Sequence, residues 1–124
     1  MAQEILDQLL QDGIDFRELS QRMMGNVHLA KKFLIKFLDD QTLTELKRSF
    51  EANDKEAMLL AVHTLKGVSG NLSFIKLYDV CSQMVKDLRE NKDTDLEKEY
   101  QQICEIHQVL INAIQTYILD DDFL

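Results

Sequence analysis

One helical segment of the chain surrounds a histidine with small residues. His63, Lys66, Gly67 and Gly70 fall within the stretch HTLKGVSGN, inside a strongly helical pattern. Each glycine in a helix interior costs about 1 kcal/mol relative to alanine, so two of them three residues apart need a physical reason. A neutral imidazole nitrogen is a competent nucleophile near neutral pH. These residues therefore indicate His63 as a candidate nucleophile.

On an ideal helix His63 faces away from the core. At about 100° per residue, the apolar side chains of this segment centre about 190° from the histidine. They are Met58, Ala61, Val62, Leu65, Val68 and Leu72. The outer face carries Lys66, Gly67 and Gly70, with Leu59 and Leu60 as exposed apolar neighbours. Bare backbone beside the imidazole would let another surface approach, and exposed leucines are typical of a docking site.

A structural explanation is open for one of the two glycines. Gly70, which precedes Asn71, can be the residue that ends the helix, because glycine is the commonest helix stop. That role is compatible with access to His63. Gly67 lies a full turn before any plausible stop and points away from the core, so access explains it better than packing.

The hydrophobic periodicity predicts an all-α chain with a single domain over residues 1–124. The chain has no proline and only four glycines. We expect a helical lead-in over 1–25 and a bundle over about 27–118. Its four long helices are expected at about 27–50, 54–71, 74–91 and 95–118. Their short connections favour an antiparallel, up-down-up-down four-helix bundle, with the lead-in helices covering one end.

Several helix starts carry capping signals. A side-chain oxygen at the N-cap, with an acidic residue three positions later, satisfies backbone N–H groups of the first turn. The expected caps are Asp15 with Glu18, Asn53 with Glu56, Thr94 with Glu97, and Asn26 alone.

The composition excludes several classes of function. The net charge of −8 opposes binding to nucleic acid or to an anionic membrane. No apolar run approaches the length of a membrane span, and the acidic N-terminus is unlike a signal peptide, so we expect a cytoplasmic protein. Cys81 and Cys104 are expected to be buried, reduced thiols. His107 is expected at the core boundary and His28 in solvent, and nothing in their spacing supports a metal site with His63.

The stretch AVHTLKGVSGNLSF resembles the motif of the histidine-containing phosphotransfer (HPt) domains of two-component phosphorelays. In that motif lysine follows the histidine by three residues and glycine by four. Upstream, GIDFRELSQRMMGN followed by HLAKKFLIKF matches the usual lead-in of the family, and LYDVCSQMVKDLRE resembles its partner helix. The resemblance extends from about Gly13 to Tyr117.

The resemblance implies a phosphoryl carrier rather than an enzyme. His63 would accept a phosphoryl group from the phospho-aspartate of a receiver domain and pass it to another receiver, while Lys66 pairs with phosphoryl oxygens. The implied partners are response-regulator receivers and a hybrid sensor histidine kinase. We expect no cofactor, because the receiver would supply Mg²⁺, and no self-phosphorylation from ATP, because no nucleotide-binding glycine-rich loop is present. A monomer is the simplest expectation.

One position departs from the family pattern. Ten residues after the histidine the family usually has glycine, whereas this chain has Ser73. We favour a role for Ser73 as the N-cap of the following helix. Its hydroxyl could instead bond the imidazole or the phosphoryl group.

Another function is compatible with the same residues. A helical adaptor could dock receivers through Leu59 and Leu60 without accepting phosphate. A bundle enzyme with a carboxylate metal centre would need inward-facing Glu and His pairs, and the apolar stripes exclude it. The starting methionine weakly favours a free protein over a domain excised from a hybrid kinase.

Overall fold

The computed structural model describes residues 1–119, which form helices joined by short turns. The helices are α1 (Gln3–Gln11), α2 (Phe16–Arg22), α3 (Val27–Phe37), α4 (Thr42–Glu51), α5 (Lys55–Asn71), α6 (Ile75–Arg89), α7 (Leu96–Ala113) and a π-helical continuation, η1 (Ile114–Leu119). Within the described residues, the only extended pairing is one antiparallel bridge between Ile14 and Phe74. The prediction of an all-α chain is therefore confirmed for this part of the chain.

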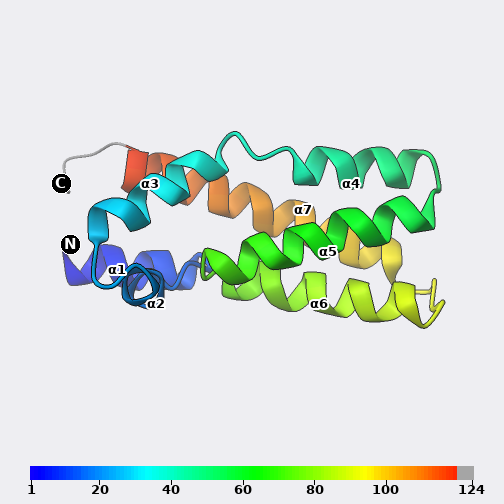
Figure 1. Cartoon of the computed structure of the whole chain (residues 1–124), viewed down its shortest axis with the longest axis horizontal. Helices are drawn as coiled ribbons and strands as arrows, with labels where there is room; N and C mark the ends of the chain where they lie inside the picture. The colour runs from blue at the N-terminus through cyan, green and yellow to red at the C-terminus, as the bar shows by residue number, and fades with distance from the viewer. Residues whose placement is uncertain (120–124) are drawn as a thin grey trace.

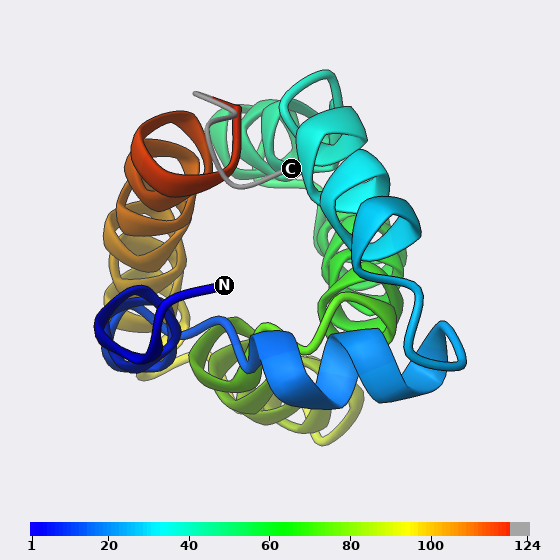
Figure 2. The ribbon, with the colours of Figure 1, turned by 90° about the vertical axis from the view of Figure 1, so that its left-hand side faces the viewer.

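The long helices lie side by side around a common core (Figure 1). α4 packs against α5, α5 against α6, α6 against α7, and η1 against α3. Figure 1 shows α4, α5, α6 and α7 running in alternating directions. In the end view of Figure 2 the helices surround the core, and α2 lies across the end where α5 passes into α6. The lead-in therefore covers the end of the molecule that contains the α5–α6 turn, as expected.

The expected continuous helix over 27–50 is wrong, because the segment divides into α3 and α4. The break falls where the apolar stripe is interrupted by polar residues. The backbone N–H of Thr42 donates to the Asp40 carboxylate at 2.9 Å, so the side chain replaces a helical carbonyl as acceptor. α3 and α4 follow one another along the same side of the molecule (Figure 1).

Two of the four expected caps are confirmed and two are wrong. Asp15 accepts from the N–H of Glu18 at 3.1 Å, and Asn26 accepts from that of Leu29 at 3.0 Å. α5 is capped by Asp54 instead of Asn53, and α7 begins after Asp95 with no side-chain cap from Thr94.

Asn53 does not start α5 because it ends α4. It adopts a left-handed backbone with φ 51°, and the next amide, of Asp54, donates to the carbonyl of Ser49 at 2.9 Å. This pattern is a Schellman motif, which normally uses glycine at the left-handed position. Ser73 and Asn91 end α5 and α6 in the same way, with φ 57° and 55°. The chain therefore uses asparagine and serine where helices commonly use glycine.

The apolar stripes of the helices form the core, and His107 lies at the edge of this core. The rings of Phe37 and Phe74 meet edge to face, with centroids 4.9 Å apart, and the half-buried His107 ring lies 5.4 Å from Phe37. Burial lowers the pKa of His107, although Asp40 opposes this shift. The expected core-boundary role of His107 is confirmed.

The two cysteines differ in burial. Cys81 is buried, and burial raises the pKa of its thiol to about 12, which leaves it a small inert hydrophobe. Cys104 is only half-buried, so the expectation of burial is wrong for that residue. Both thiols are free, as expected.

Candidate functional site

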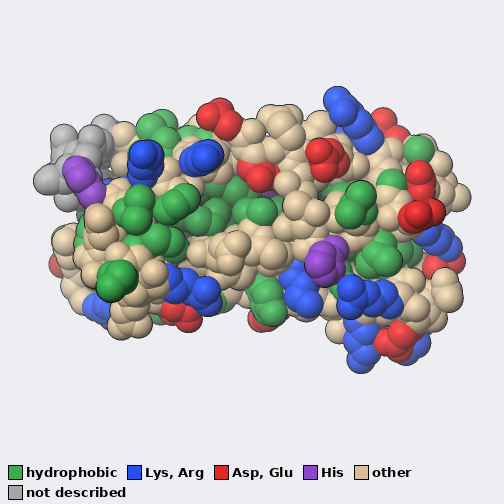
Figure 3. All heavy atoms as spheres, viewed as in Figure 1, with side chains coloured by type: hydrophobic (Ala, Val, Ile, Leu, Met, Phe, Trp, Pro, Cys, Tyr) green, Lys and Arg blue, Asp and Glu red, His purple; other side chains and the backbone are tan. Residues whose placement is uncertain are grey.

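The imidazole of His63 lies on the solvent-exposed face of α5. Figure 3 shows a histidine over α5 with lysine and arginine side chains near it. Met58, Ala61, Val62 and Leu65 are buried on the opposite face of the helix. The outward orientation expected from the helical periodicity is confirmed. His28 is exposed on α3, also as expected.

Gly67 leaves open space one turn from the imidazole. A Cβ atom built at this position meets no other atom within 4 Å. The glycine is therefore not required by packing inside the described structure, and the backbone of α5 is bare beside His63. Both residues line one depression, together with Lys66 and residues of α2 and α6.

Gly70 has a different role from Gly67. A Cβ atom at position 70 would lie 3.4 Å from Cδ2 and Cε2 of Tyr78, a residue of α6. The aromatic ring therefore lies against the backbone of α5 at this glycine. α5 continues to Asn71 and its C-cap is Leu72, so the alternative that Gly70 ends the helix is wrong.

Lys66 is half-buried and lies between the imidazole-bearing turn and α6. Its Nζ atom is 5.7 Å from the centroid of the Tyr78 ring, within the range of a cation–π interaction. Among the described residues no ion pair neutralises this ammonium group. The site thus contains an ammonium group one helical turn from His63 that forms no ion pair among the described residues.

The two leucines beside His63 are not equivalent. Leu60 is 72% exposed, as expected, but Leu59 is half-buried and packs against the core. The expectation that both are exposed is therefore wrong for Leu59. A second depression, which includes His63 and Arg89 of α6, is lined by both leucines. Leu60 is the residue of the pair that presents a large apolar surface to a partner.

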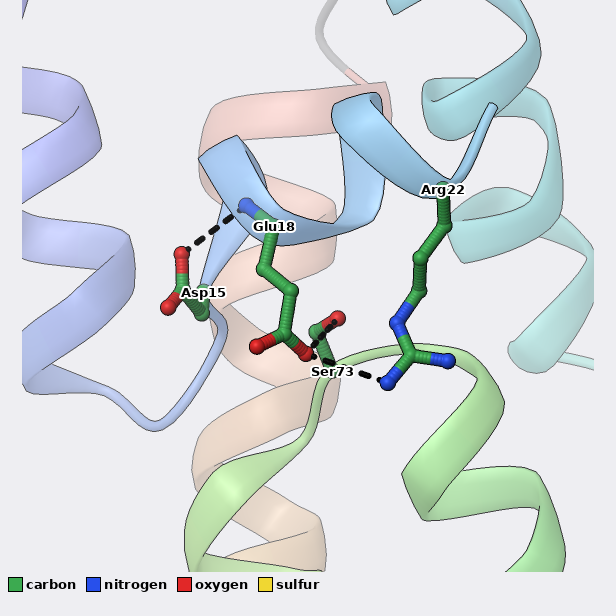
Figure 4. Close-up of polar contacts among 4 residues, drawn as sticks. All are labelled: Asp15, Glu18, Arg22 and Ser73. Carbon is green, nitrogen blue, oxygen red and sulfur yellow. Dashed lines mark hydrogen bonds and ion pairs between the residues drawn. The ribbon is translucent and has the colours of Figure 1, made fainter. Parts of the chain in front are cut away.

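Ser73 is a buried link between the lead-in and the α5–α6 turn. It is 2% exposed, and its hydroxyl donates to Oε1 of Glu18 at 2.9 Å (Figure 4). The same carboxylate oxygen is 3.4 Å from Arg22, and the backbone of Ser73 accepts from the N–H of Asp15 at 3.0 Å. The expected N-cap role is wrong, because Phe74 precedes α6 and Ser73 terminates α5.

The sequence singled out Glu18 only as part of a capping box, and missed Arg22 and Tyr78 as neighbours of His63. All three line the depression that contains His63. Asp15 caps α2 as expected, but the Glu18 carboxylate accepts from the Ser73 hydroxyl and not from the N–H of Asp15, which donates to the Ser73 carbonyl. The short turn between α5 and α6 could have predicted that Tyr78 lies near the site, because it places the first turns of α6 beside the last turns of α5.

The described residues contain no group of three or more His, Cys, Asp or Glu side chains that could hold a metal ion. None of the helices described is both long enough and apolar enough to span a bilayer. The chemistry available at the site is that of an exposed imidazole with a neighbouring cation.

Comparison with known proteins identifies the family. Residues 33–116, about two-thirds of the chain, match the Hpt domain. The chain therefore belongs to the Hpt domain family, whose members carry phosphoryl groups in phosphorelay histidine phosphotransfer and interact with receiver domains and kinases. The match includes all of α5, whereas α1 and α2 precede it. No curated protein and no solved structure matches the chain.

Proposed function

We propose that the protein is a phosphorelay intermediate that carries a phosphoryl group on His63. It accepts the group from the phospho-aspartate of one receiver domain and passes it to the aspartate of another. The observation that carries this proposal is the exposed imidazole of His63 beside the open backbone at Gly67, within a chain of the Hpt family.

The chemical step requires an unprotonated imidazole nitrogen. Its lone pair forms the N–P bond while the P–O bond to the aspartate breaks and the carboxylate leaves with the bonding pair. Catalysis of phosphoryl transfer is mainly positioning and charge neutralisation. Lys66 supplies positive charge from this chain, and the receiver supplies its own Mg²⁺ and loops. Gly67 allows those loops to reach the ring without meeting a side chain.

The remaining parts of the proposal concern the protein as a whole. We propose an antiparallel, up-down-up-down four-helix bundle in which α3 and α4 together form one member. It acts as a monomer in the cytoplasm, between a hybrid sensor histidine kinase and response regulators. It has no ATP-dependent kinase activity, so the pure protein incubated with labelled ATP should take up no label.

The decisive experiment is transfer of labelled phosphate from a phosphorylated receiver to the purified chain. The wild type should acquire label that is labile to acid and stable to alkali, as expected of a phosphoramidate. His63→Gln should acquire none. His28→Gln is the matched control, because His28 is also exposed but lies on α3, and it should be labelled like the wild type. Label retained by His63→Gln would refute the assignment.

A second function, a non-phosphorylated adaptor, is favoured by one observation. Leu60 exposes a large apolar side chain beside His63, and this surface can bind a receiver whether or not phosphate is transferred. In that case receivers would bind the wild type and His63→Gln equally, and neither protein would take up label. Leu60→Ser would then weaken binding. The same glycines would mark a docking surface only.

A further inference from the structure

The side chain of Tyr78 contacts α5 at Gly70 and also lies close to Lys66, two residues that the sequence analysis did not connect. Its ring lies against α5 where Gly70 has no side chain, and the ammonium of Lys66 lies 5.7 Å from the ring centroid. A methyl group at position 70 would just fit at 3.4 Å, so any larger side chain would displace the ring. The glycine at position 70 therefore admits an aromatic ring from α6, and that ring faces Lys66.

The position of this ring matters because lysine is flexible. The lysine side chain has a flexible four-carbon stem with many rotamers. Fixing it in one conformation costs entropy, and this cost weakens any contact that the ammonium group makes. An aromatic face attracts an ammonium group through its quadrupole and needs no negative charge to do so. Tyr78 can thus hold Lys66 in place while its positive charge stays available to an anion. A carboxylate in the same position would neutralise that charge.

We propose that Tyr78 is a positioning residue that holds Lys66 beside His63 for interaction with the phosphoryl group. This inference rests on the proposed phosphoryl transfer and names a residue that serves it. Tyr78 is 41% exposed and lines the same depression as His63, so it lies within the surface that a receiver would cover. Gly67 and Gly70 then serve different purposes. Gly67 leaves space for the receiver beside His63, and Gly70 leaves space for the ring of Tyr78.

The test compares two substitutions that differ in the aromatic face alone. Tyr78→Phe keeps the ring and removes the hydroxyl, whereas Tyr78→Leu keeps apolar volume and removes the ring. The rate constant for transfer from a saturating phosphorylated receiver should fall about two- to fivefold in Tyr78→Leu, the effect of losing one exposed cation–π contact. It should change little in Tyr78→Phe. Because Tyr78 is partly exposed, both variants are expected to fold, and circular dichroism checks this.

A double-mutant cycle separates positioning from a structural role. In a Lys66→Ala background, Tyr78→Leu should have no further effect on the transfer rate, because no ammonium remains to be positioned. Ring-current shifts of the Lys66 side-chain protons report the geometry directly by NMR, and they should vanish in Tyr78→Leu without any phosphate present.

The outcomes distinguish this proposal from the proposed function. If the wild type is labelled at His63 but Tyr78→Leu transfers at the wild-type rate, or if its defect persists in the Lys66→Ala background, the positioning role is overturned and the carrier function stands. If the wild type takes up no label, the carrier function fails and the role of Tyr78 fails with it.

Discussion

Ser73 offers a quantitative test of how the α5–α6 turn is held. Two effects oppose each other at this residue. Its left-handed backbone, φ 57°, is unfavourable for any residue with a Cβ, while its buried hydroxyl donates to Glu18 at 2.9 Å. Ser73→Ala removes the hydrogen bond and keeps the backbone strain. Ser73→Gly removes both, so the pair of variants separates the two effects.

The magnitudes follow from the surroundings. A hydrogen bond to a charged group contributes about 1.5–3 kcal/mol, and the lower value applies here because the Glu18 side chain is 46% exposed and water can replace the hydroxyl. Substitution by glycine relieves about 1–2 kcal/mol of left-handed strain in the folded state. It also raises the conformational entropy of the unfolded chain, which destabilises the folded state by about 0.4–1 kcal/mol. We therefore expect a destabilisation of about 1.5 kcal/mol for Ser73→Ala and about 0.7 kcal/mol for Ser73→Gly.

Urea and thermal unfolding measure these differences. At about 4 °C per kcal/mol for a chain of this size, Ser73→Ala should lower the melting temperature by about 6 °C and Ser73→Gly by about 3 °C. Glu18→Ala combined with Ser73→Ala should show a coupling free energy of about 1 kcal/mol, because each change alone removes one partner of the hydrogen bond. Equal stability of the alanine and glycine variants would refute the strain argument, and zero coupling would refute the hydrogen bond. Because the Ser73 hydroxyl donates to Glu18 and not to the imidazole, Ser73→Gly should leave the rate of transfer to receivers unchanged.

Two further predictions concern Gly67 and Glu99. Gly67→Ala should stabilise the protein by about 1 kcal/mol in urea unfolding, because alanine favours the helix. Gly67→Leu should slow transfer from a receiver at least tenfold, because the bulky receiver meets the new side chain. The same variant should be labelled by a small phosphoramidate donor at the wild-type rate. Equal slowing with both donors would refute the access argument. Glu99 is 5% exposed, and burial with the neighbouring Asp87 raises its pKa to about 7. The folded chain therefore holds a proton that the unfolded chain releases near pH 4.5, so stability falls as pH rises from about 4.5 to 7. Glu99→Gln should be more stable than the wild type at pH 8, by about 1–3 kcal/mol, with the difference vanishing below pH 4.5. His107, whose depressed pKa acts in the opposite direction, is common to both proteins and cancels. A pH-independent difference between the two proteins would contradict the assignment.

The orientation of His63 could be predicted because α5 is a regular helix. The angular position of each side chain then depends only on its number along the chain, and a continuous apolar stripe defines the buried side. The caps at Asp15 and Asn26 could be predicted for a related reason, since each bonds a backbone amide three residues away. Asn53 and Asp54 were harder to distinguish. Both can cap a helix, and the choice depended on how α4 ends.

The contacts between helices could not be read from the sequence. Ser73 bonds Glu18 across 55 positions of sequence, and its hydroxyl has an equally plausible local use as a cap. The ring of Tyr78 reaches Gly70 only because α5 and α6 pack closely after their short turn. Similarly, the half-burial of Leu59 depends on which neighbouring side chains cover it.

The sequence by itself determined the helical character of the chain, the outward face of His63 and the kinship with Hpt domains, because periodicity and local motifs act over a few residues. Only the tertiary structure decided that Gly70 faces an aromatic ring, that Ser73 ties the lead-in to the α5–α6 turn, and that Lys66 lies against Tyr78. These are contacts between side chains of different helices, and their energies depend on distances that no local pattern encodes.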